Sequence, residues 1–142
     1  MHLYELEDLD ASLPLVPLAA RRALDRAEIK VGLEAWTALA LDTRCAITTE
    51  GSREVVDAAR VRALLAGVPS ESHDAWPEPS SQELPPRIAE VLPALTLATW
   101  SSLRGLDRWV VSSFVRRDKH DALRALAREL REPQLTPRRR EE

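Results

Sequence analysis

Apolar residues in this chain recur three or four positions apart over most of its length, with charged residues between them. That spacing gathers the apolar side chains on one face of an α-helix. It predicts helices over residues 18–27, 33–39, 41–48, 97–103, 106–114 and 123–130, and a longer helix that Ser52 caps and Gly67 ends. Thr96 is expected to cap the helix over 97–103, and Asp118 with Asp121 to cap the helix that follows them. The pattern predicts an all-α fold.

A tryptophan-centred frame occurs twice, 64 positions apart. The first copy is Val31-x-Leu33-x-x-Trp36-x-x-Leu39 with Arg44, and the second is Leu95-x-Leu97-x-x-Trp100-x-x-Leu103 with Arg108. We therefore expect one helical domain over residues 1–132, with about six helices in two related halves at about 17–66 and 87–131. Trp36 and Trp100 are expected in its core, with Leu33 on the same stripe as Trp36.

The arginines of the two frames allow two interpretations. Arg44 and Arg108 are clamps for a carboxylate or phosphate, or each guanidinium binds helix-end carbonyls or stacks on a neighbouring ring. The second interpretation is favoured, because packing would require each arginine to be duplicated together with its tryptophan.

The segment over residues 67–86 contains five prolines and several serines, so we expect a linker without regular structure. Trp76 is the single aromatic residue in it. Because an indole is costly to leave in water, we expect Trp76 to be anchored on the helical body. Residues 133–142, which follow the last predicted helix, are expected to form a disordered tail.

Composition and charge say more about where the protein is located in the cell than about its chemical activity. The 142 residues carry a net charge of −3 and one cysteine, Cys45, so no internal disulfide can form. The first ten residues are acidic where a secretory signal would be basic and then apolar, and no apolar run is long enough for a membrane span. We expect a cytoplasmic protein that does not contact a membrane.

Catalytic motifs are missing from the sequence. The pairs His73-Asp74 and His120-Asp121 suggest a helical metal phosphohydrolase, but no His-x-x-x-His, Glu-x-x-His or Cys-x-x-Cys spacing completes a metal site. Glycine-rich phosphate loops and Gly-x-Ser-x-Gly elbows are also missing. The sequence predicts a protein that is not an enzyme and has no metal or cofactor.

A helical DNA-binding or regulatory protein is the alternative function. The last predicted helix carries Arg124, Arg128 and Arg131, but Asp121 and Glu129 alternate with them. The alternation and the negative net charge make nucleic-acid binding the weaker interpretation.

Several segments resemble a known family in their residues and spacing. They are Val16-Pro17-Leu18-x-x-Arg21-x-x-Leu24-Asp25-x-x-x-Ile29-Lys30-Val31-x-Leu33-x-x-Trp36, the opening Leu3-Tyr4-Glu5-Leu6-Glu7, Trp76-Pro77, and the second tryptophan frame through Arg108. Together they resemble the nitrate-reductase-associated protein family over about residues 3 to 130. The family pattern has glycine before Ile29-Lys30, whereas this chain has Glu28. The difference suggests a different turn at this position.

The resemblance implies an accessory protein of assimilatory nitrate reductase, supporting assembly or activity of that or another molybdopterin enzyme through protein–protein contact. Arg21, Asp25 and Lys30 match family positions outside the apolar stripe, so each is a candidate partner contact or, equally, a member of an intramolecular pair. A second candidate surface is the basic corner at Arg116 and Arg117, which would dock on an acidic partner.

Overall fold

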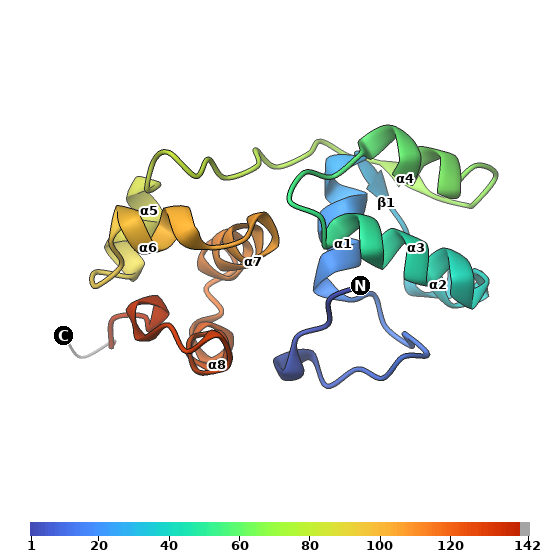
Figure 1. The fold of residues 1–142 in the computed structure, drawn as a ribbon. Helices are drawn as coiled ribbons and strands as arrows, with labels where there is room; N and C mark the ends of the chain where they lie inside the picture. The colour runs from blue at the N-terminus through green and yellow to red at the C-terminus, as the bar shows by residue number, and fades with distance from the viewer. Residues whose placement is uncertain (140–142) are drawn as a thin grey trace. The chain divides into compact units, whose positions relative to one another are not determined.

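The computed structural model describes residues 1–139, which are mostly helical, as the pattern predicted. They form eight α-helices, two short 3-10 helices and a two-stranded sheet. The chain divides into two compact units, Met1–Glu78 and a second unit from Pro79 onward (Figure 1). The division falls inside the proline-rich segment 67–86. A single domain over residues 1–132 stays a prediction.

The first unit contains five helices and both strands. They are η1 (Glu5–Glu7), α1 (Leu18–Arg26), β1 (Ile29–Lys30), α2 (Leu33–Ala38), α3 (Leu41–Gly51), α4 (Ala58–Leu64) and β2 (Glu71–Ser72). Its core is built from small side chains of α1 together with larger ones from the elements around it: Leu13, Ala20, Ala23, Leu24, Ala27, Trp36, Ile47, Val61 and Leu65.

Helices α1 and α3 approach each other closely because both present small residues at their contact. A Cβ atom built on Gly51 would lie 1.6 Å from the carbonyl oxygen of Ala19. No side chain fits in that space, so the glycine at the end of α3 sets the distance between the two helices.

A carboxylate from the N-terminal segment caps α1. Pro17 precedes the helix and has no side-chain oxygen to accept its first N–H groups. Glu7 supplies one instead, because its carboxylate accepts the N–H groups of Leu18 (2.5 Å) and Tyr4 (3.0 Å). Nearby, hydrogen bonds from the Ser12 hydroxyl and N–H lower the pKa of Asp10.

Trp36 is fully buried, as predicted, and its indole N–H donates to the carbonyl of Leu13 at 3.0 Å. Leu13 has a left-handed backbone, with φ of 50°, and its side chain is buried. The same carbonyl accepts a hydrogen bond from Arg44 Nη1 at 3.1 Å. The indole therefore fastens the non-helical segment before α1 to the core.

The expected helix start at Ser52 is wrong. Helix α3 continues to Gly51, and the Ser52 hydroxyl donates to the carbonyl of Thr48 at 2.7 Å and so closes that helix. Helix α4 starts after Asp57, whose side chain accepts the N–H of Arg60. Val55, which falls inside the expected helix, lies in the connection between α3 and α4 and is exposed.

The segment 67–86 contains regular structure that the sequence did not predict. β2 pairs with β1 in antiparallel register, Ile29 opposite Ser72 and Lys30 opposite Glu71. Pairing is possible because Glu28, with φ of 61°, turns the chain sharply after α1. That left-handed conformation favours glycine, and here a glutamate adopts it. The strap, residues 71–78, then continues along α1.

The second unit contains α5 (Pro86–Val91), α6 (Leu97–Ser102), α7 (Gly105–Arg116), α8 (His120–Leu130) and η2 (Pro133–Leu135). Thr96 caps α6 as predicted, since its hydroxyl accepts the N–H of Thr99 at 3.2 Å. Trp100 is fully buried, and its indole N–H donates to the carbonyl of Ser80 at 2.8 Å. The predicted stripe of α7, Leu106, Trp109, Val110, Ser113 and Phe114, is buried throughout.

The expected capping pair Asp118 and Asp121 is not formed. Asp118 has φ of 56° and ends α7, and its carboxylate lies 2.9 Å from His120 Nε2. Asp121 pairs with Arg124 at 3.0 Å. Lys119 occupies the N-cap position of α8 without a side-chain cap bond.

Residues 133–135, expected in a disordered tail, form η2 instead. Leu135 is buried, and Gln134 Oε1 accepts the N–H of Thr96 at 2.9 Å. The N–H of Arg138 donates to the carbonyl of Val91. Burial of the apolar Leu135 side chain stabilises this stretch, which is otherwise mostly polar. Residues 140–142 of the expected tail lie outside the described residues.

Leu33 and Leu97 do not share the buried stripe of their tryptophans. They are 52% and 47% exposed, each at the first position of a six-residue helix. A helix this short buries little more than the one side chain that points inward, and in both cases that side chain is the indole.

We predict that Gly51→Ala destabilises the protein by about 3 kcal/mol, because the new methyl group would overlap the Ala19 backbone. Chemical denaturation followed by circular dichroism measures this. Gly32→Ala is the control, since nothing lies within 4 Å of its Cβ position, and should change stability by less than about 1 kcal/mol. Equal stability of the two variants would contradict the close α1–α3 contact.

We also predict that Trp36→Ala and Trp100→Ala each cost roughly 3–5 kcal/mol, mainly through the cavity that they leave. At Trp100 the carbonyl of Ser80 also loses the indole donor. The same denaturation experiment measures both. A cost below about 1 kcal/mol for either variant would show that its indole does not hold its unit together.

Candidate partner-binding site

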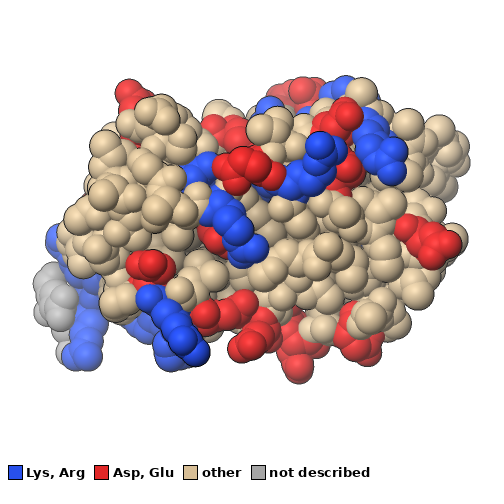
Figure 2. All heavy atoms as spheres, in the orientation of Figure 1, with Lys and Arg blue, Asp and Glu red and all other residues tan. Residues whose placement is uncertain are grey.

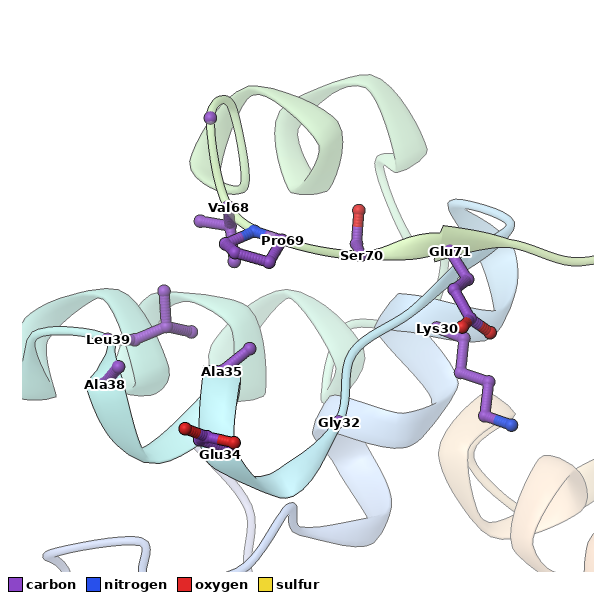
Figure 3. A pocket seen from close by; sticks show the side chains of 11 residues that line it. Lys30, Gly32, Glu34, Ala35, Ala38, Leu39, Val68, Pro69, Ser70 and Glu71 are labelled. Carbon is purple, nitrogen blue, oxygen red and sulfur yellow. The ribbon is translucent and has the colours of Figure 1, made fainter.

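An open groove lies between α2 and the chain segment that follows α4. Its volume is about 870 Å³, and it is lined by Lys30, Gly32, Glu34, Ala35, Ala38, Leu39, Gly67, Val68, Pro69, Ser70 and Glu71. Figure 3 shows Ala35 of α2 and Leu39, which follows that helix, facing Val68 and Pro69 across the space. The middle of the groove is apolar, and the charged residues lie along its rim.

The groove opens where the β1–β2 ladder stops. The N–H of His73 donates to the carbonyl of Glu28 at 3.1 Å, and hydrogen-bonded pairs alternate along an antiparallel ladder. Continuing from Lys30 and Glu71, the next such pair would be Gly32 and Pro69. Proline has no N–H to donate, so the ladder ends and the two chains separate. Gly67, with φ of 79°, turns the chain after α4 into this position.

Three charged residues on the rim give it an excess of one negative charge. Lys30 and Glu71 are cross-strand partners, and Glu34 lies in the first turn of α2. All three are exposed. The groove therefore combines an apolar centre with a weakly acidic edge, which suits an apolar side chain that has a basic neighbour.

A buried arginine that sequence analysis missed holds the strap on α1. Arg22 is 1% exposed. Its Nη1 donates to the carbonyls of Gly51 and Arg53, its Nη2 to the carbonyl of Glu54, and its Nε to Glu78 Oε1 at 2.8 Å. Nη2 also contacts Glu78 Oε1 directly. One guanidinium thus joins α1, the chain after α3 and the end of the strap.

Two further polar side chains of α1 contact the strap. Asp25 Oδ1 accepts the N–H of Trp76 at 3.4 Å and lies 3.9 Å from His73 Nε2. Arg26 Nη1 donates to the carbonyl of Trp76 at 2.9 Å. Asp25 Oδ2 is buried and has no hydrogen-bond partner within residues 1–139.

The candidate contacts in the first unit have different environments. Arg21 is exposed, and its Nε donates to the carbonyl of Val16. Asp25 is buried beneath the strap, so it cannot meet a partner while the strap is in place. Lys30 lines the groove. Arg21 and its neighbour Arg22 differ in role because successive helix positions point about 100° apart.

Trp76 differs from the expected anchor. Its backbone is held on α1, but its side chain is 51% exposed. Polar contacts of the main chain, and not burial of the indole, therefore fix this part of the strap.

The frame arginines both contact main-chain carbonyls, but only those bound by Arg108 lie at a helix end. Arg44 Nη1 donates to the carbonyls of Ser12 and Leu13. Arg108 Nη1 donates to the carbonyl of Leu103 and, at 3.5 Å, to that of Ser101.

Basic residues gather in the second unit. Arg116 and Arg117 are exposed at the end of α7, and Arg128 and Arg131 line a hollow of about 360 Å³ beside η2. Figure 2 shows Lys and Arg side chains over this end of the chain, with carboxylates among them. Residues 79–142 carry 12 Lys and Arg against 9 Asp and Glu, whereas residues 1–78 carry 8 against 14.

Within the described part of the chain, no group of three His, Cys, Asp or Glu side chains is placed to hold a metal ion. His73 and His120 each lie beside one aspartate instead. None of the helices in residues 1–139 has the combined length and apolar character that crossing a bilayer requires.

We predict that Arg22→Met destabilises the protein by about 3 kcal/mol, because it leaves Glu78 and several carbonyls without their donor. Thermal and chemical denaturation measure the loss. The matched control is Arg21→Met, an exposed neighbour on the same helix, which should cost less than about 1 kcal/mol. Similar losses in both variants would show that the Arg22 contacts contribute little.

Comparison with known proteins gives one match. Residues 3–130 match the family model described as conserved nitrate reductase-associated protein. No curated protein and no solved structure matches the chain.

Proposed function

Because the chain belongs to the conserved nitrate reductase-associated protein family, we propose that it is a non-enzymatic accessory or maturation factor of nitrate reductase. It acts in the cytoplasm, in nitrate assimilation, by protein–protein contact with this molybdopterin enzyme. The family match over most of the chain is the observation that carries the proposal. The groove of the first unit supplies a surface on which such contact could be made.

The groove accepts a short segment of the reductase that carries an apolar side chain next to a basic one. The apolar side chain lies between Leu39 and Val68, and the basic one lies beside Glu34 and Glu71. The charge of the whole unit, 14 acidic against 8 basic side chains, favours approach of a basic segment. Of the contacts proposed from the sequence, Lys30 belongs to this surface, and Arg21, Arg116 and Arg117 remain exposed candidates outside it.

We further propose that the two units descend from one duplicated helical half. Helices α2 and α6 each have six residues, and their first residues lie 64 positions apart. The first residues of α3 and α7 also lie 64 positions apart. Leu39 follows α2 and Leu103 follows α6, and the two residues have nearly the same backbone angles. The N–H of Leu39 donates to the carbonyl of Trp36, and the N–H of Leu103 donates to the carbonyl of Trp100. The groove is completed by β1 and by the segment that follows α4, and the described residues of the second unit contain no strand.

We predict that the purified chain retains nitrate reductase from an extract of its own source at moderate salt, and that Glu34→Arg weakens binding about tenfold. The substitution turns the excess charge of the rim from negative to positive. Mass spectrometry identifies the retained proteins, and a titration with purified reductase gives the affinity. Glu83→Arg, an exposed acid of the second unit, is the control and should bind like the wild type.

Three other results are informative. Retention of the reductase with equal affinity for Glu34→Arg would reject the groove but keep the accessory role. Retention of no molybdenum enzyme would reject the role itself. Strongly salt-dependent binding to duplex DNA would favour the alternative, a DNA-binding or regulatory protein that uses the basic C-terminal helices.

A further inference from the structure

Trp76 is unlike the other tryptophans of the chain. Trp36, Trp100 and Trp109 are buried, whereas Trp76 is 51% exposed. Its main chain is held on both sides, since Asp25 accepts its N–H and Arg26 donates to its carbonyl. A large apolar side chain is therefore presented to solvent from a fixed backbone. Little backbone entropy would be lost if a partner covered it.

A second exposed apolar side chain lies on the segment that Arg22 joins to the strap. The guanidinium binds the carbonyls of Arg53 and Glu54 and the carboxylate of Glu78, so it holds these three residues around one side chain. Val55, next to Glu54, is 77% exposed. We call the exposed side chains of Val55 and Trp76, with the two segments that carry them, the Arg22 junction.

The exposed charges nearest in sequence to these two side chains are mostly acidic. Glu54 and Asp57 flank Val55, and Asp74 precedes Trp76 by two positions. Arginines also lie near these side chains, but each has an acidic neighbour: Arg53 and Arg60 lie 3.1 and 3.5 Å from Glu50, and Arg26 lies 3.9 Å from Glu78. A matching partner surface therefore has an apolar pocket with a basic rim.

We propose that the Arg22 junction is a second contact with the reductase, in which Trp76 enters an apolar pocket rimmed by Lys or Arg side chains. This inference rests on the proposed function and adds an anchor residue that the groove does not contain. Tryptophan is the residue type most enriched at positions that dominate binding energy, because a rigid, two-sided ring loses much water-exposed area when it is covered. Arg22 acts here as a positioning residue.

The test is the affinity of purified reductase for the full chain, the variant Trp76→Ala and the control Leu97→Ala. Leu97 is an apolar side chain of similar exposure, 47%, in the second unit. Trp76→Ala should weaken binding about 30-fold, and Leu97→Ala less than about twofold. Both variants should keep the melting temperature of the wild type within about 2 °C, since neither side chain is in a core.

Tryptophan fluorescence provides a second measurement that does not depend on a variant. Addition of a reductase domain without tryptophan, or of reductase labelled with non-fluorescent tryptophan analogues, should shift the emission of the wild type to shorter wavelength as Trp76 loses water. Trp76→Phe should show no such shift, because its remaining indoles are buried before and after binding.

Each result separates the two proposals. If the wild type binds and Trp76→Ala binds equally well, or the emission does not shift, the Arg22 junction is rejected and the accessory role stands. If the wild type does not bind the reductase, both are rejected. If Trp76→Ala weakens binding and also lowers the melting temperature, the binding of Val55→Ser is measured instead, because a 77% exposed side chain contributes little to folding. Weaker binding at an unchanged melting temperature supports the Arg22 junction, and unchanged binding rejects it.

Discussion

The fold depends on a requirement that a buried indole imposes. An indole N–H that leaves water must find an acceptor, and the fully buried side chains of Trp36 and Trp100 find theirs outside their own six-residue helices. Each donates to a carbonyl in an irregular segment, Leu13 in the first unit and Ser80 in the second. The hydrogen bond therefore joins each six-residue helix to a stretch of chain that has no regular structure of its own.

The sequence was sufficient for features that depend on neighbouring residues. The stripe of α7 and the Thr96 cap were correct because both follow from spacing within one turn or a few turns. Ser52 and Asp118 were misassigned for a common reason: a residue type that can start a helix can also end the preceding one. Ser52 binds back to Thr48, and Asp118 adopts the left-handed turn after α7. Which role is taken depends on packing that local sequence does not contain.

The candidate site was less predictable, because every part of it is non-local. Lys30 was singled out from the sequence and lies on the groove, but the groove itself requires β1 to meet a strand about 40 positions later. Arg22 was overlooked beside Arg21, since sequence alone does not tell which of two adjacent arginines finds distant carbonyls. Asp25 was expected at the surface and is covered by the strap. Its polar character serves the main chain of Trp76.

The carbonyl of Leu13 has two donors, Trp36 and Arg44. When one donor is removed, the other still satisfies the oxygen, and only loss of both leaves it bare in the interior. The energetic effects of changes at these two positions are thus coupled and do not add. In the second unit Trp100 and Arg108 bind different carbonyls, those of Ser80 and Leu103. Trp100 and Arg108 therefore lack the shared acceptor that couples Trp36 to Arg44, and the two units face different constraints on sequence drift at these positions.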